Sequence, residues 1–216
     1  MLPAAALAPN KPFRDYVLDN WGVEQGLPQI TVTAITQDGE GYLWLGSQTG
    51  LARFDGVHFQ NFALRDALGL DSGIQALLAD DHGRLWVGTA RSLLVLENGK
   101  LRNLTPPGKP GEPPPRFPVA ALAFVDGQVL VAGPDGLYAP TTDGLRRVRP
   151  LPGPATSLLT GPDGLWIGSR GQVLQLVAGQ LEPHPLPDGM ADVAVNALAH
   201  FDGEVYASTR DRKSVV

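Results

Sequence analysis

The sequence YLWLG at residues 42–46 returns as RLWVG at 84–88 and as GLWIG at 164–168. Two weaker copies, VLVAG at 129–133 and EVYAS at 204–208, place Leu or Tyr where the other copies have Trp. The central positions are residues 44, 86, 130, 166 and 206, so successive copies lie 42, 44, 36 and 40 residues apart. A regular period of this length indicates a repeat architecture in which each repeat is one supersecondary unit.

Each copy has the same internal plan of short apolar segments separated by turns. In the first copy these segments lie at residues 32–36, 42–45, 51–54 and 57–62. The sequence contains eight Asp-Gly pairs, which suit the positive-φ positions of tight turns between antiparallel strands. The repeat therefore predicts an all-β fold, a β-propeller of four-stranded antiparallel sheets called blades.

About 4.5 to 5 blades are present by this count, and we expect them to form part of a larger propeller. The blades are predicted near residues 30–62, 73–104, 117–149, 155–182 and 193–216, within a partial propeller at 12–216. Residues 1–11 are read as a leader, either the cleavage end of a secretory signal or an Ala/Pro-rich tail. A competing arrangement is five-fold closure, in which residues 13–18 supply an outer strand to the last blade.

Composition excludes several classes of protein. With 43% hydrophobic residues the chain has enough apolar surface to fold, and 26 Gly and 20 Pro leave few windows for a helical bundle. The absence of Cys removes disulfides, zinc-thiolate sites and Cys nucleophiles. A net charge of −5 argues against a nucleic-acid partner, and no apolar run is long enough to predict a membrane segment.

The repeated aromatic and glycine positions have a structural interpretation. We expect the large side chains to fill the gaps between neighbouring blades, and the glycines two residues later to let the strand end tightly and turn. These positions are Trp44, Gly46, Trp86, Gly88, Trp166 and Gly168.

Patterns for catalysis are missing from the sequence. No nucleotide-binding, hydrolase or zinc motif occurs. The four histidines are predicted in an outer strand (His58), in a turn (His82), in a Pro-rich connector (His184) and near the end of an inner strand (His200). None pairs with another at metal-ligand spacing, so we expect no catalytic residue, metal or cofactor.

One set of polar residues falls in equivalent turns. The turns between the second and third strands of a propeller lie on one face, and here they carry Gln48, Arg91, Arg170 and Arg210. Arginine forks suit carboxylate, sulfate or phosphate groups. The hypothesis is a face that binds an acidic small molecule or acidic glycan; the alternative is that these are unrelated solvated arginines.

The opening of the repeat region resembles a known family. The run WGVEQGLPQ at 21–29, followed by VTAITQD at 32–38 and GYLWLGSQTGLARFDG at 41–56, is similar to the two-component regulator propellers. The resemblance implies a periplasmic sensor region of a bacterial receptor, a membrane-bound dimer whose output is a histidine kinase or a diguanylate cyclase. It also implies a chain that binds ligand and is not itself an enzyme.

Two other functions stay open at this point. A propeller lyase or lactonase of the streptogramin-lyase type has similar repeats, although it needs a His or a metal at the mouth of the central channel. A scaffold that binds another protein across its face is the third alternative, because a fold does not fix function.

Overall fold

The structure is a computed structural model that describes residues 19–62, 73–105, 115–209 and 214–215. Apart from one 3-10 turn, η2 (Val23–Gln25), its regular elements in these residues are all β-strands. Among the described residues, no helix is long and apolar enough to cross a membrane.

The strands form five antiparallel sheets, each in chain order. The first contains β1 (Val32–Gln37), β2 (Leu43–Ser47), β3 (Leu51–Phe54) and β4 (Phe59–Phe62). The second contains β5 (Ile74–Ala79), β6 (Leu85–Thr89), β7 (Leu93–Glu97) and β8 (Lys100–Asn103). The third contains β9 (Ala121–Val125), β10 (Gln128–Gly133), β11 (Gly136–Thr141) and β12 (Gly144–Pro150). The fourth contains β13 (Ser157–Gly161), β14 (Gly164–Gly168), β15 (Gln172–Val177) and β16 (Gln180–Pro185). The fifth contains β17 (Val195–Phe201), β18 (Glu204–Thr209) and β19 (Ser214–Val215).

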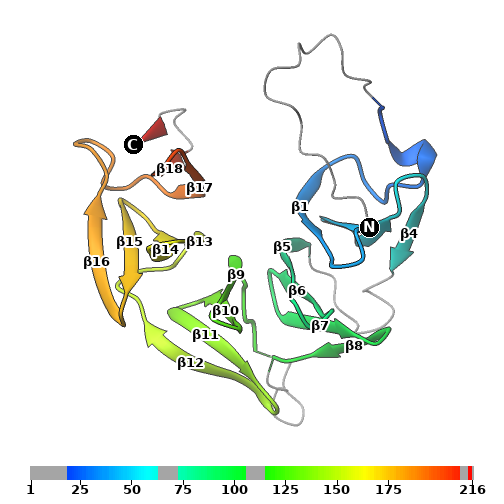
Figure 1. Ribbon diagram of the computed structural model, residues 1–216, viewed down its shortest axis with the longest axis horizontal. Coiled ribbons are helices and arrows are strands. Elements are labelled where there is room, and N and C mark those ends of the chain that lie inside the picture. The colour runs from blue at the N-terminus through cyan, green and yellow to red at the C-terminus, as the bar shows by residue number, and fades with distance from the viewer. Residues whose placement is uncertain (1–18, 63–72, 106–114, 210–213, 216) are drawn as a thin grey trace.

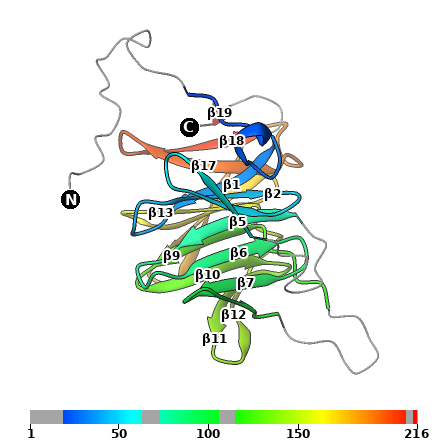
Figure 2. The ribbon, with the colours of Figure 1, turned by 90° about the vertical axis from the view of Figure 1, so that its right-hand side faces the viewer.

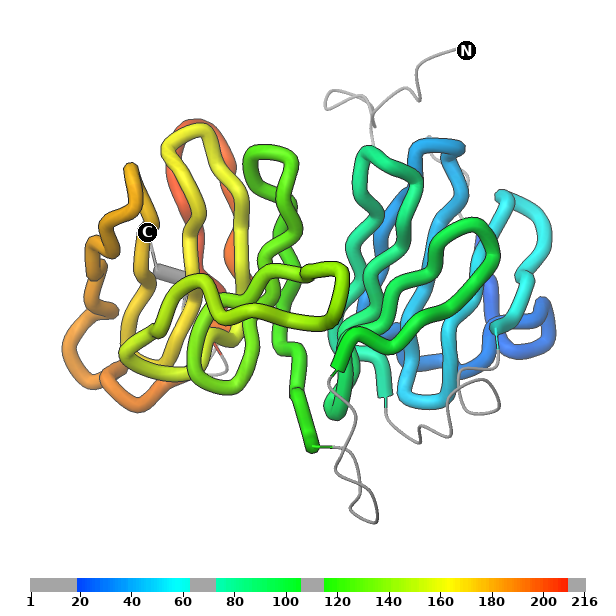
Figure 3. The backbone as a smooth tube through the Cα atoms, turned by 90° about the horizontal axis from the view of Figure 1, so that it is seen from below, coloured from blue at the N-terminus to red at the C-terminus, as the bar shows by residue number. Residues whose placement is uncertain are grey.

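The sheets stand around a common centre as the blades of a propeller. Their first strands are innermost and contact one another in chain order from β1 to β17 (Figure 1). The first and second sheets face the viewer in Figure 2, and in Figure 3 the strands run between two opposite faces of the arc, where the turns gather. The prediction of an all-β propeller with antiparallel blades is confirmed. The fifth sheet has three strands in the described residues.

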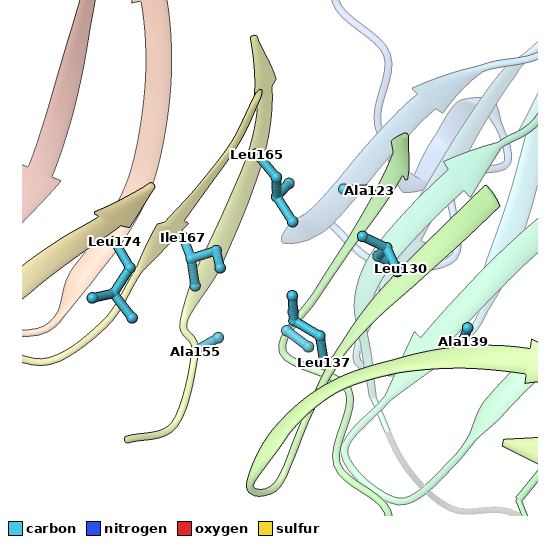
Figure 4. Close-up of a cluster of buried hydrophobic side chains, with 9 residues drawn as sticks. Ala123, Leu130, Leu137, Ala139, Ala155, Leu165, Ile167 and Leu174 are labelled. Atoms are coloured by element: carbon cyan, nitrogen blue, oxygen red, sulfur yellow. The ribbon is translucent and has the colours of Figure 1, made fainter. Parts of the chain in front are cut away.

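The hydrophobic core is divided among the junctions between neighbouring sheets. Trp44 of the first sheet packs with Ile74 and Val87 of the second. Trp86 of the second sheet packs with Val131 of the third and with Val119, which lies just before β9. Figure 4 shows the junction of the third and fourth sheets, where the cluster includes Leu130, Leu137, Ile167 and Leu174. Each sheet is therefore stabilised mainly by the sheets on either side of it.

The repeated glycines are required by these junctions and not by turns. A Cβ atom at Gly46 would lie 2.5 Å from Cγ2 of Ile74, and one at Gly88 would lie 2.5 Å from Cγ1 of Val119. A Cβ atom at Gly168 would lie closest to Oγ of Ser157 in the same sheet, and 2.8 Å from Cγ1 of Val195. Since none of the three glycines has a positive φ, the physical reason predicted from the sequence was wrong. At all three positions a residue in or just before the first strand of the following sheet comes too close to the glycine for a side chain to fit.

Positive φ occurs instead in some of the predicted hairpin turns. Asp126 and Gly127 have φ values of 50° and 76°, and Asp202 and Gly203 have φ values of 51° and 81°. These are the conformations that tight two-residue turns demand of both central residues.

Residues before the first strand pack on the first sheet. The Trp21 ring lies 4.8 Å from that of Phe54, between ring centroids, and Asn61 Nδ2 donates to the carbonyl of Gly26 at 3.0 Å. This segment covers the outer strands of the sheet and leaves Ile35 on the inner strand β1 60% exposed. Residues 13–18, proposed above as an outer strand of the last blade, lie outside the described residues.

Candidate functional site

Three of the four predicted ligand-binding residues lie in equivalent turns. Gln48 follows β2, Arg91 follows β6 and Arg170 follows β14, so all three belong to the turn between the second and third strands of their sheet. Buried hydroxyls hold the first two of these turns, because Ser47 Oγ and Thr89 Oγ1 each accept hydrogen bonds from N–H groups of the turn residues that follow. In the third turn, Ser169 Oγ donates to the carbonyl of Pro154. The backbone that carries the candidate residues is therefore fixed locally.

The side chains of these residues share a face but do not meet. Gln48 and Arg170 are exposed and Arg91 is half-buried. Arg170 Nη1 donates to the carbonyl of Asp192 at 2.8 Å, and no hydrogen bond or ion pair joins any two of the three within the described part of the chain. Arg210 lies outside the described residues.

The corresponding turn of the third sheet carries an acid. Asp135 accepts hydrogen bonds from the Tyr138 hydroxyl and from Nη1 of Arg147. The bond from Tyr138 is the main reason why the pKa of Asp135 lies below its ordinary value, and the charge of Arg147 acts in the same direction. The predicted face is thus not uniformly basic, because an ionised Asp135 sits in its middle sheet.

A groove that the sequence did not predict lies between the first and second sheets. Its volume is about 460 Å³, within the range of roughly 300–1,000 Å³ typical of small-molecule sites. Its lining includes Trp44, Arg53, Gln60, Phe62, Arg84 and Asn98. The Arg53 guanidinium lies 4.3 Å from the ring centroid of Tyr42 and donates to Gln60 Oε1 at 2.8 Å.

Two aspartates, Asp38 of the groove lining and Asp80 of the second sheet's first turn, bind the indole N–H of a tryptophan in the same way. Asp38 Oδ2 accepts from the indole N–H of Trp44 at 2.7 Å, and Asp80 Oδ2 accepts from that of Trp86 at 2.8 Å. Each aspartate stands six residues before its tryptophan, and its Oδ1 also accepts two backbone N–H groups of the turn between them. The sequence feature that could have predicted this hydrogen bond is an Asp six residues before a Trp, which occurs in both repeats.

The fourth sheet lacks this partner for its tryptophan. Its turn is shorter, so Thr160 stands six residues before Trp166 and donates to the carbonyl of Phe124 instead. Trp166 Nε1 is buried without a hydrogen-bond partner. Trp166 lines a hollow of about 340 Å³ between the fourth and fifth sheets, together with His184 and Glu204.

The histidines are spread over four sheets. His82 lies in the turn before β6 and His200 lies in β17, as predicted. The other two placements were wrong: His58 lies in the turn before β4, and His184 belongs to β16, opposite Val173, because the proline-rich segment continues the sheet as an edge strand. Edge strands tolerate proline because one side of their backbone has no partner.

A group of possible metal ligands, Asp80, Asp81 and His82, lies in the turn before β6. Asp80 is occupied on both oxygens by protein donors, and Asp81 pairs with Nδ1 of His82 at 2.6 Å. These contacts account for the group without an ion.

The fold and the repeat define the chain as a β-propeller repeat protein. The family model described as two component regulator propeller matches residues 26–49 and 69–91, so these two segments are similar to that repeat, as the sequence resemblance predicted. No curated protein is significantly similar to the sequence.

Solved structures with the same fold include a receptor extracellular domain and an enzyme. One is the extracellular domain named as that of the hybrid two component system BT3049 from B. thetaiotaomicron, with a TM-score of 0.68 and 18% identity over 91% of this chain. Another is virginiamycin B lyase from Staphylococcus aureus, with a TM-score of 0.63, 13% identity, 85% of this chain and 68% of the lyase covered. The chain spans 31% of the BT3049 domain, so it corresponds to about a third of that neighbour.

Proposed function

We propose that this propeller is the ligand-sensing, extracytoplasmic part of a bacterial signal-transduction receptor, and that it binds without catalysing a reaction. The observation that carries the proposal is the two-component regulator repeat on a propeller whose sheets are held by apolar junctions. The structural similarity to the extracellular domain of a hybrid two-component system supports the same role. In this proposal the arc belongs to a larger propeller in the periplasm, and the receptor is a membrane-bound dimer.

The proposed ligand is a small acidic molecule or an acidic glycan that contacts the face carrying Arg91 and Arg170. Arg170 uses Nη1 for the carbonyl of Asp192, which leaves most of its N–H donors for a ligand. Charged hydrogen bonds from a planar guanidinium to a carboxylate are among the stronger polar contacts in proteins. Ligand binding would then shift the population between two arrangements of the receptor.

Titration calorimetry with a uronic-acid oligosaccharide, and with a neutral oligosaccharide of equal length, tests this site. The double variant Arg91→Ala/Arg170→Ala is expected to lose at least about tenfold in affinity for the acidic probe, since each charged hydrogen bond is worth about 1.5–3 kcal/mol. Affinity should also fall as salt is raised.

Arg146→Ala provides the matched control, because Arg146 is an exposed arginine on β12, away from these turns. It should leave the affinity unchanged. Unchanged binding of the acidic probe by the double variant would contradict the proposed site. Failure of the unaltered chain to bind the acidic probe at all would contradict the ligand class.

A lyase is the second candidate, favoured by the structural likeness to virginiamycin B lyase. The histidines give it little support. His58, His82, His184 and His200 belong to four different sheets, and no hydrogen bond or ion pair joins two of them in the part of the chain that the structure describes.

A further inference from the structure

The groove between the first and second sheets lies on the face opposite to the one that carries Arg91 and Arg170. It is lined by Gly39, Gly83 and Gly99, which belong to the turns β1–β2, β5–β6 and β7–β8. The turns with Arg91 and Arg170 lie at the other ends of the strands. Each of the two sheets has four strands in chain order, so the groove is bounded on both sides by a complete sheet.

The wall that the second sheet supplies is apolar. Ala79, Leu85 and Leu96 line the groove and form one row across three strands, because Ala79 pairs with Leu85 and Leu85 pairs with Leu96. From the first sheet, the rings of Trp44 and Phe62 line the same groove, 5.1 Å apart between centroids. A ligand that fills the space between these walls therefore has an apolar body.

The first sheet places a charged side chain opposite this apolar row. Arg53 pairs with Trp44 on the neighbouring strand as Val95 pairs with Trp86 in the second sheet. At the next junction, Val95 is buried and packs in the same cluster as Trp86. Arg53 is half-buried, and among the described residues no carboxylate lies within ion-pair distance of it.

An aromatic ring and an amide hold the Arg53 side chain in place. The guanidinium lies 4.3 Å from the ring centroid of Tyr42, and its Nη2 donates to Gln60 Oε1 at 2.8 Å. Because a guanidinium only donates, Gln60 turns its oxygen toward Arg53 and keeps its amide NH2 group as a further donor. A positioned guanidinium with free N–H groups, next to an amide donor, suits a carboxylate.

The acidic side chains near the groove have other partners or lie in water. Asp38 accepts two backbone N–H groups of its own turn and the indole N–H of Trp44. Asp80 accepts from Nε of Arg84, the second arginine of the lining. Glu40 is exposed, so water and salt screen its charge. Arg53 therefore remains as the charged partner for a ligand.

We propose that this groove binds a small monocarboxylate with an apolar body, of the arylalkyl carboxylate class. The carboxylate accepts hydrogen bonds from Arg53 and from the Gln60 amide, and the apolar body lies between Phe62 and the row that contains Leu96. This site is separate from the acidic-ligand face of the proposed function, and it does not depend on that proposal.

Titration calorimetry with three probes that share one apolar body tests the ligand class. Phenylbutyrate is expected to bind at least about tenfold more tightly than phenylbutanol or phenylbutylamine, because only the carboxylate accepts charged hydrogen bonds. Acetate, which lacks the apolar body, should bind at least about tenfold more weakly than phenylbutyrate. The proposal would be overturned by an amine or an acetate that binds as tightly as phenylbutyrate, or by failure of phenylbutyrate to bind.

Two variants test the residues of the site. Arg53→Gln removes the guanidinium, and it should weaken phenylbutyrate binding at least about tenfold while phenylbutanol binding stays the same. Gln60→Glu places a carboxylate beside Arg53, which occupies the guanidinium and repels the ligand, so the same loss is expected. Since Gln60 is exposed, this second variant should fold like the unaltered chain, and thermal melts of both variants verify folding.

Arg102→Gln is the matched control. Arg102 lies opposite Val95 on β8 as Gln60 lies opposite Arg53 on β4, it is exposed, and it does not line the groove. This variant should bind phenylbutyrate like the unaltered chain. Full affinity for phenylbutyrate in a folded Arg53→Gln or Gln60→Glu chain, or an equal loss in Arg102→Gln, would overturn the proposed site.

Discussion

Replacement of Asp80 by alanine is expected to lower the free energy of unfolding by about 3–5 kcal/mol, the usual cost of breaking a buried charged pair. The Asp80 side chain is fully buried, and its partner Arg84 is 27% exposed at the side chain. Its Oδ2 accepts from Arg84 Nε at 2.6 Å and from Trp86 Nε1 at 2.8 Å. Its Oδ1 accepts from the N–H groups of His82 and Arg84. Alanine would leave all of these donors without an acceptor.

Urea unfolding followed by tryptophan fluorescence measures this loss. Asp81→Ala is the control, because the neighbouring Asp81 is exposed and pairs only with the exposed His82 among the described residues. Exposed substitutions of this kind usually change stability by less than about 0.5 kcal/mol. An Asp80→Ala chain that unfolds at the same urea concentration as the control would show that the network does not hold the turn.

The Asp80 carboxylate also makes the free energy of unfolding depend on pH. Burial of Asp80 raises its pKa, but the hydrogen bonds from Trp86 and Arg84 outweigh this, and the pKa of Asp80 in the folded chain lies below its ordinary value. As the pH falls, Asp80 is therefore protonated in the unfolded chain at a higher pH than in the folded chain. The stabilisation is complete above the unfolded pKa of about 3.9 and is lost as pH falls through the folded value. In Asp80→Asn this part of the acid dependence should be absent.

Trp86→Ala should cost about 3–5 kcal/mol, the range for deleting a buried aromatic side chain. Trp86 is 4% exposed and lies in the cluster that joins the second and third sheets. Its removal leaves a cavity next to Val119 and Val131, and it also removes a donor to Asp80. The loss affects two sheets together, so we expect the mid-point of a thermal melt to fall while unfolding stays cooperative.

Phenylalanine variants separate packing from hydrogen bonding. Trp86→Phe keeps an aromatic ring but removes the bond to Asp80, and it should cost about 1–3 kcal/mol because a buried acceptor loses a donor. Trp166→Phe removes an indole N–H that has no partner, so it should cost distinctly less than Trp86→Phe. Equal costs at the two positions would contradict this account of the hydrogen bonds.

Much of the fold was readable from the sequence because each repeat carries its own pattern. Alternating apolar residues and Asp-Gly turns determine short antiparallel strands, and the spacing of Trp44, Trp86 and Trp166 determines how often the pattern returns. The residues of the predicted ligand face could be assigned to turns for the same reason. Whether Arg91 and Arg170 act together could not be read, because their separation depends on how far the arc turns between sheets.

Several features of the protein depend on contacts between repeats and could not be predicted from one repeat. The need for glycine at position 88 comes from Val119, which lies just before the next sheet. The groove beside Arg53 exists only where two sheets meet. Nor does any local pattern distinguish Ile35, which is exposed, from the equivalent Leu77, which is packed between sheets. A repeat encodes the faces of its sheet through side-chain alternation, whereas the cover on each face is supplied by residues about 40 positions away in the chain.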